Sequence, residues 1–463
     1  MAGSTPEGGR PSNALNPAAG KAQAGPMSIR HSIAGAIALA TTLGSLAADF
    51  AIHDGDRVVF LGDSITEQRL YTTYIEAYAL TRHPSWKLTF RNVGWGGDTA
   101  WLRQRAHPDE ARLFAADETA QQQMIEASVG SGLARDVLPL HPTFVTVKFG
   151  MNDHSYQAFR PDIFRAYARG QSEIAKVLGG TGARVAFLTP QPIEEKRADP
   201  DKDIRNLSLR QFSDGLKEVA ARGNAQFVDQ FAPYMGVMLA ERAKNPQAFI
   251  GGGDAVHPGP AGHTLMAWAV LKGLGASAAV SKVEIQIASG SAAADGCKVE
   301  NVDTGGGGVA FDRTDDALPM PIDVRAVAAL KLAPVLEDLS QYGLRVAGLA
   351  EGNYEITIDG ESAAKASAVE LAAGINLSSA EGPVTKQARE VLALVFQKND
   401  AFFNRWRNVQ LHSFPAWAKG PETEALRQAE VKRIDGLIAG EEEKIDAARQ
   451  PRKHHFVVKR ASP

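Results

Sequence analysis

The segment from Arg57 to Thr66, with the sequence RVVFLGDSIT, limits the possible folds of this chain more than any other stretch. Residues 58–61 are all apolar, without the polar alternation of a strand that has one solvated face, so they predict a central strand of a parallel sheet. Gly62 ends this run, and a helix-like segment follows at 67–82. Ser64 is therefore expected where a strand gives way to a helix, at the carboxyl edge of the sheet, where open α/β sheets bind ligands.

Short apolar strands and helical segments alternate from here to about residue 275. Strands are expected at 58–61, 88–93, 144–149, 184–188 and 226–228, and helices near 67–82, 120–138, 161–178, 205–222 and 260–274. This alternation is typical of a three-layer α/β/α fold with a parallel sheet. We therefore predict an α/β domain over residues 48–276.

The pattern changes after this domain. Short strands separated by Gly- and Ala-rich runs predict a β-rich accessory module over 280–380, with a helical part at 325–340 and a hairpin formed by 344–349 and 354–358. Apolar residues at helical spacing predict a C-terminal helical segment over 384–450. The basic run near the C-terminus, 452–460, is expected to be a solvated tail.

The N-terminal region has the features of an export signal that begins inside the chain. Residues 1–26 are mostly small or polar, so we expect disorder there. From Met27 a short basic region, an apolar run and a small-residue cleavage site follow, which predict a signal peptide over 27–47 with cleavage between Ala47 and Ala48. The apolar run is short for a membrane span. We expect translation to start at Met27 and the protein to be periplasmic or secreted; the alternative is a buried or amphipathic helix.

The overall charge restricts the partners. In 463 residues, 50 Lys and Arg are balanced by 53 Asp and Glu, which argues against nucleic acid, because phosphate binding needs a basic surface. A small neutral or weakly charged substrate fits this balance better. The single cysteine, Cys297, excludes an intrachain disulfide and argues against a structural zinc site.

Four polar sites follow strands or lie in loops at the expected ligand edge. Ser64 is a candidate nucleophile, and the alternative is a helix N-cap. Gly97, in the glycine-rich run 92–99, can offer its N–H to a developing oxyanion, and so can the side chain of Asn152 in the segment GMND. Asp254 and His257 lie three positions apart in a tight loop, so the carboxylate can orient the imidazole toward Ser64.

Together these motifs, GDSIT, GGDT, GMND and DAVHP, closely resemble those of the SGNH hydrolases of the GDSL esterase/lipase superfamily. The resemblance covers about 55–275 and has one difference, Ile65 where the family name has Leu. It implies a flavodoxin-like sheet, no metal or organic cofactor, and a serine esterase. The residues it implies are Ser64 as nucleophile, His257 as base, Asp254 as its orienter, and an oxyanion hole from the Ser64 N–H, the Gly97 N–H and the Asn152 side chain.

The substrate is predicted from residues near these motifs. The candidate substrate contacts are Asp63, Tyr71, Trp95, Trp101, Asp153 and Tyr156, the aromatic ones either as a sugar-stacking wall or as core residues. With the expected export and accessory module, this pattern resembles secreted carbohydrate esterases, so we expect removal of acetyl groups from a small ester or an acetylated polysaccharide. The alternatives are a general short-chain or lipase-like esterase, and a polysaccharide-binding or assembly protein acting through residues 280–463.

Overall fold

The computed structural model describes residues 49–196 and 199–461. The disorder expected for 1–26 and the signal peptide expected for 27–47 lie outside these residues. Residues from Ala48 onward form one compact unit, and the domain boundaries that we placed within it remain predictions. None of the helices in the described residues has the length and apolar character needed to cross a bilayer.

The predicted parallel sheet is present, with the strand order β2-β1-β3-β4-β5 and parallel pairing throughout. Its strands are β1 (Arg57–Gly62), β2 (Thr89–Asn92), β3 (Phe144–Lys148), β4 (Arg184–Leu188) and β5 (Gln226–Val228). The principal helices around it are α1 (Ser64–Glu67), α2 (Leu70–Arg82), α5 (Glu118–Asp136), α6 (Pro161–Gly179), α7 (Ile204–Arg222), α8 (Phe231–Lys244) and α9 (Pro260–Gly273). Shorter helical segments are α3 (Arg103–Ala106), α4 (Glu110–Ala115) and η1 (Leu138–Leu140).

The two faces of this sheet bury separate cores. Val58 and Phe60 of β1 pack with buried residues of α2, α8 and α9, whereas Val59 and Leu61 pack with those of α5 and α6 and most of those of α7. Because neighbouring strand residues point to opposite faces, a continuous apolar run is what a sheet covered on both sides requires. The three-layer flavodoxin-like fold is thereby confirmed.

The β-rich part contains two further sheets, ordered β13-β10-β6-β7 and β12-β11-β14-β9-β8. The strands are β6 (Ala279–Gln286), β7 (Ser291–Asp295), β8 (Cys297–Asp303), β9 (Val309–Asp315), β10 (Gln341–Ala347), β11 (Asn353–Ile358), β12 (Glu361–Ser367), β13 (Ile375–Asn376) and β14 (Lys453–Arg460). Helical turns join them at η2 (Gly305–Gly307), η3 (Val324–Lys331), α10 (Val335–Leu339) and α11 (Ala368–Ala373), which confirms the helical part expected near 325–340.

Two sequence expectations for this part are wrong. β10 and β11 do not form a hairpin: β10 pairs with β6 and β13, whereas β11 pairs with β12 and β14 in the other sheet. The basic tail is not solvated either, because β14 lies between β11 and β9 at the centre of its sheet. Phe456 and Val458 are fully buried there, whereas Lys453, His455, Lys459 and Arg460 are exposed.

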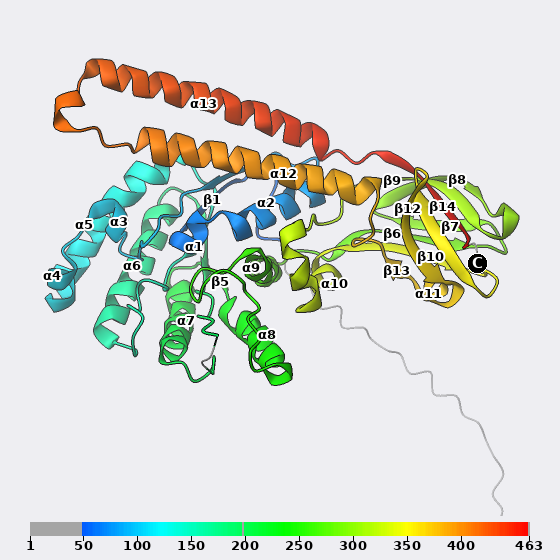
Figure 1. Cartoon of the computed structure of the whole chain (residues 1–463). Helices are drawn as coiled ribbons and strands as arrows, with labels where there is room; N and C mark the ends of the chain where they lie inside the picture. The colour runs from blue at the N-terminus through cyan, green and yellow to red at the C-terminus, as the bar shows by residue number, and fades with distance from the viewer. Residues whose placement is uncertain (1–48, 197–198, 462–463) are drawn as a thin grey trace, which may run out of the picture. The chain divides into compact units, whose positions relative to one another are not determined.

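The C-terminal helices pack against the α/β part. α12 (Pro383–Phe403) continues into a π-helical turn, η4 (Asn404–Gln410); the 3₁₀ turn η5 (Ala416–Ala418) precedes α13 (Pro421–Ala448), which returns alongside α12 (Figure 1). The Lys398 ammonium of α12 lies 2.5 Å from the carboxylate of Glu76 on α2, and both side chains are buried. Asn399 adds hydrogen bonds to Thr73 and Glu76. The predicted helical segment is thus attached to the α/β part by a buried polar network.

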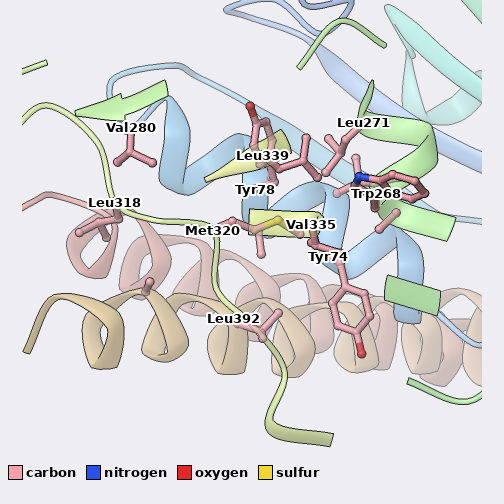
Figure 2. Close-up of a cluster of buried hydrophobic side chains, with 14 of the residues drawn as sticks. Tyr74, Tyr78, Trp268, Leu271, Val280, Leu318, Met320, Val335, Leu339 and Leu392 are labelled. Atoms are coloured by element: carbon pink, nitrogen blue, oxygen red, sulfur yellow. The ribbon is translucent and has the colours of Figure 1, made fainter. Parts of the chain in front are cut away.

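The apolar core also crosses this junction. Figure 2 shows Tyr74 and Tyr78 of α2 gathered with Trp268 and Leu271 of α9, and Met320 lies among them. The same cluster includes Val280 of β6, Leu318, Val335, Leu339 and Leu392 of α12. Because burial of apolar area is the main stabilising contribution to folding, this shared cluster makes the α/β part, the β-rich part and α12 depend on one another.

Candidate active site

Ser64 is the first residue of α1, directly beyond the end of β1. The turn before it needs a glycine, because a Cβ on Gly62 would lie 2.6 Å from the backbone oxygen of Lys148. Asp63 caps the helix by accepting the Ile65 N–H at 3.0 Å. Its carboxylate also pairs with the buried Lys148 ammonium at 3.3 Å. Asp63 is completely buried by these contacts, so the structure corrects its place among the candidate substrate contacts.

The structure brings Ser64, His257 and Asp254 together in a line. Ser64 Oγ lies 2.9 Å from His257 Nε2, and His257 Nδ1 lies 3.1 Å from Asp254 Oδ2. A carboxylate can only accept a hydrogen bond, so the imidazole proton belongs on Nδ1. Nε2 is then free to accept the proton of the serine hydroxyl, which is the arrangement that activates a nucleophile.

The loop that carries Asp254 and His257 is held in a tight turn. Asp254 Oδ1 accepts the N–H groups of Val256 and His257, each at 2.7 Å. Partial burial alone would raise the pKa of Asp254, but these two N–H groups and the His257 ring outweigh it and lower the pKa. Gly253 has a φ of +72°, and a Cβ there would lie 2.2 Å from the His257 carbonyl. Only glycine fits this position.

Three groups next to Ser64 can donate to an oxyanion. Among the described residues, the N–H groups of Ser64 and Gly97 have no hydrogen-bond acceptor. The Asn152 amide donates one of its two N–H bonds to the Asp98 carbonyl at 2.9 Å, which leaves the other available. Tyr156 donates its hydroxyl to Asn152 Oδ1 at 3.3 Å. These contacts fix the orientation of the amide.

Asp153 supports the two loops that contain these donors, Asn152 and the segment around Gly97. Its carboxylate accepts the N–H of Ala100 and the N–H of Gly150, both at 2.8 Å. The side chain is completely buried, and this desolvation raises its pKa to about 7 although the two N–H groups oppose the shift. Asp153 therefore ties the loops together beneath the site. Its assignment as a substrate contact is also corrected.

The proposed aromatic wall is largely part of the core. Trp101 is buried, donates its indole N–H to Glu110 at 2.7 Å and packs edge-on against Phe114. Tyr71 is buried and stacks against His263, and its hydroxyl is hydrogen-bonded to the Thr66 hydroxyl. Neither can reach a substrate, so both assignments are corrected in favour of the core alternative.

Trp95 and Tyr156 remain partly accessible. Tyr156 is 42% exposed beside Asn152. The face of Trp95 is covered by the guanidinium of Arg407 at 3.5 Å, and its edge meets Trp406 at 5.8 Å. Trp95 therefore contacts the π-helical turn η4 as well as the edge of the site.

Sequence reasoning missed two carboxylates that hold the site in place. Glu67, three residues after Ser64, accepts the Gly96 N–H at 2.7 Å. Glu194 accepts the N–H groups of Ile250 and Gly251, each at 2.7 Å, at the start of the histidine loop. The position of Glu67 one turn beyond the serine was a usable signal. Glu194 lies far from its partners in the sequence and offered none.

Comparison with known proteins gives a family match within the α/β part. Residues 60–265 match the GDSL-like Lipase/Acylhydrolase family. A comparison with curated proteins finds no match. Among solved structures, a gut microbial diltiazem-metabolizing enzyme is similar at 24% identity with a TM-score of 0.70, over 89% of this chain and 98% of that one. Its similarity in fold thus extends over the C-terminal half as well.

Two further solved structures are similar over about half of this chain. A variant of Axe2, an acetylxylan esterase from Geobacillus stearothermophilus, has 22% identity and a TM-score of 0.35 over 49% of this chain and 96% of that one. LAE5, an alpha/beta hydrolase enzyme from the metagenome of Lake Arreo, has 22% identity and a TM-score of 0.36 over 49% and 98%. The motifs around Ser64, the parallel sheet and the match of residues 60–265 to the GDSL-like Lipase/Acylhydrolase family together lead to one conclusion: the protein is a carboxylic ester hydrolase.

Proposed function

We propose that this protein removes short acyl groups, acetyl above all, from carbohydrate esters, with Ser64, His257 and Asp254 as its catalytic triad. The observation that supports it best is the continuous line of contacts from Ser64 Oγ through the His257 ring to Asp254. The proposal needs no metal or organic cofactor, because the ring nitrogen supplies the base and backbone and amide groups supply the positive charge density.

In the proposed reaction, Ser64 Oγ attacks the ester carbonyl while its proton passes to His257 Nε2. The tetrahedral oxyanion accepts hydrogen bonds from the N–H groups of Ser64 and Gly97 and from the Asn152 amide. Collapse of this intermediate breaks the bond to the sugar oxygen, which takes the proton from His257 and leaves. Water, deprotonated by His257, then attacks the acyl-enzyme and releases acetate with Ser64 restored.

A short acyl group on a polar alcohol suits the side chains that stay accessible around Ser64. They include Tyr156 and the half-buried Arg103 and Gln104, and the polar ends of Arg103 and Gln104 lie beside Gly97. Sugars are bound in proteins by such groups, which combine hydrogen bonds with flat apolar faces. One structurally similar protein is described as diltiazem-metabolizing and another as an acetylxylan esterase. Diltiazem and acetylated xylan are therefore included among the compounds to be assayed.

The test compares acetyl and octanoyl esters of 4-nitrophenol, and then acetylated polysaccharides, using wild type and Ser64→Ala. We expect acetyl esters to be cleaved faster than octanoyl esters, acetate to be released from the polysaccharide, and Ser64→Ala to lose turnover by about 10⁴-fold or more. Activity of Ser64→Ala near that of wild type would refute the proposed catalytic triad. A preference for octanoyl esters would instead favour the lipase-like alternative.

We also propose export through a signal peptide at 27–47. Its support is the order of basic, apolar and small residues in that segment. N-terminal sequencing of the protein recovered outside the cytoplasm is expected to begin at Ala48. A first residue upstream of Ser28 would contradict this proposal.

A further inference from the structure

A second cleft lies next to the candidate active site, between the α/β part and the C-terminal helices. It has a volume of about 660 Å³. Trp95 and Arg135 line it from the α/β part, Arg407 from the π-helical turn, and Phe414, Lys419 and Arg427 from the connection to α13 and its first turns. The stretch 399–417, which is unusually aromatic and basic, therefore forms much of its wall.

The cleft reaches the loop next to the nucleophile. Gln104 lines it, and the side-chain nitrogen of Gln104 would lie 3.0 Å from a Cβ placed on Gly97. A Cβ placed on the preceding Gly96 would lie 3.9 Å from the Cβ of Ser64. The Gly96 N–H donates to Glu67, whose other carboxylate oxygen lies 3.6 Å from the Arg407 guanidinium. A substrate whose ester carbonyl is at Ser64 can thus extend past Gly96 into this cleft.

Arg407 is held in place by Trp95 and by a long ion pair with Glu67. Its guanidinium lies flat over Trp95 at 3.5 Å, and within the described residues it makes no hydrogen bond; its nearest carboxylate, Glu67, is beyond hydrogen-bond distance at 3.6 Å. Partial burial and the neighbouring Arg105 and Arg135 lower its pKa, with Glu67 opposing them. An arginine that is stacked on a ring, and whose guanidinium makes no hydrogen bond in the described part of the chain, is suited to binding a carboxylate with two parallel hydrogen bonds.

The other charges of the cleft also favour an anion. Lys419 is exposed and has no partner in the described residues. Arg427 is 3.4 Å from Glu424, the one carboxylate among the lining residues. Arg135 pairs with Asp136 at 2.8 Å. Arg427 also donates to the backbone oxygen of His412 at 2.9 Å. Lys419 and the N–H groups of Arg407 that its 3.6 Å ion pair with Glu67 does not engage are therefore the donors left for a ligand.

Two further features mark this surface as a binding surface. Trp417, at the tip of the connection between α12 and α13, is 87% exposed, and an exposed indole of this kind is typical of a recognition surface. Arg407 lies in a π-helical turn, which is rarer than α-helix and often occurs at functional sites. A concave site with hydrogen-bond donors and aromatic rings suits a sugar better than a lipid surface.

We propose that this cleft binds a carboxylate-bearing sugar, a uronic acid unit next to the acetylated sugar, with Arg407 and Lys419 on its carboxylate and Trp417 as an outer stacking surface. This inference rests on the proposed carbohydrate esterase function and narrows its substrate to acidic glycans. Arg407 and Lys419 act in substrate recognition and take no part in the proton transfers at Ser64.

The test measures binding without hydrolysis, so that its failure is separate from failure of the esterase proposal. The full-length protein is titrated calorimetrically with an unacetylated oligogalacturonide and with the same oligosaccharide after its carboxylates have been reduced to alcohols. We expect binding of the acidic form alone, weakened by added salt because the contacts are ionic. Lys419→Glu is expected to lower the affinity about tenfold, since a charge-assisted contact becomes a repulsion.

The matched control is Lys432→Glu, the same charge change at an exposed position of α13 away from the cleft. We expect it to bind and to hydrolyse acetyl esters like wild type. Equal binding of the acidic and reduced oligosaccharides, equal effects of the two variants, or binding of phosphatidylglycerol vesicles in place of the oligosaccharide would each overturn the proposal. Oligosaccharide binding without acetate release from acetylated glycans would instead overturn the proposed function.

Discussion

The contact between Glu67 and Gly96 makes a prediction about turnover. Glu67 accepts the Gly96 N–H at 2.7 Å, and the next N–H along the chain, that of Gly97, is a proposed oxyanion donor. Glu67→Ala removes this acceptor, so the loop can turn away from Ser64. A hydrogen bond to a charged group contributes about 1.5–3 kcal/mol, which corresponds to about a 10- to 150-fold loss if it serves only the transition state. We expect kcat to fall within that range and KM to stay nearly unchanged.

The assay is steady-state hydrolysis of 4-nitrophenyl acetate by Glu67→Ala, Glu67→Gln and wild type, with thermal unfolding to confirm that each variant is folded. Glu67→Gln keeps an oxygen acceptor for Gly96 and loses only the charge, so its kcat is expected to fall by about fivefold. A kcat for Glu67→Ala equal to that of wild type would refute the reasoning. Equal losses in both variants would show that the negative charge matters and the positioning of Gly96 does not.

The remaining predictions concern stability and the oxyanion amide. Lys398→Met leaves the Glu76 carboxylate buried without its cation. We expect this to destabilise the fold by about 3–5 kcal/mol and to lower the Tm measured by calorimetry by about 3–6 °C. Adding Glu76→Gln should restore most of the lost stability. The pKa of Asp153 is raised to about 7, so the folded state binds more protons than the unfolded state between about pH 4 and 7. The free energy of unfolding therefore falls by up to about 4 kcal/mol as pH rises through this range. Urea titrations of Asp153→Asn at several pH values should lack this part of the pH dependence. Tyr156→Phe removes the 3.3 Å contact to Asn152 and should lower kcat by about threefold, whereas an unchanged kcat would show that Asp98 alone orients the amide.

The sheet and the motif residues could be predicted because both depend on local patterns. The apolar run 58–61 predicts a strand that is buried on both faces. Ser64, Gly97 and Asn152 each follow the end of a strand, which places them at one edge of the sheet. Only the distances that join Ser64, His257 and Asp254 had to come from the structure.

The errors arose where sequence proximity was used to infer side-chain direction or long-range pairing. Trp101 and Tyr71 lie near the motifs in the sequence, but a turn directs Trp101 into the core and Tyr71 lies on the buried side of α2. Both strands of the supposed hairpin, 344–349 and 354–358, exist, yet their partners come from distant parts of the chain. In 453–460 the many cationic residues drew attention away from the alternation of buried and exposed positions that is typical of a strand and that buries Phe456 and Val458.

The central position of β14 determines when the β-rich part can fold. In the sheet β12-β11-β14-β9-β8, the strand that leaves the ribosome last lies in the middle, so β11 and β9 have no shared partner until synthesis has passed Arg460. Until then each presents an unpaired edge, which is the kind of surface that aggregates or recruits chaperones. The sheet must therefore be completed after translation of its other strands, and loss of β14 would divide it into two separate pairs of strands.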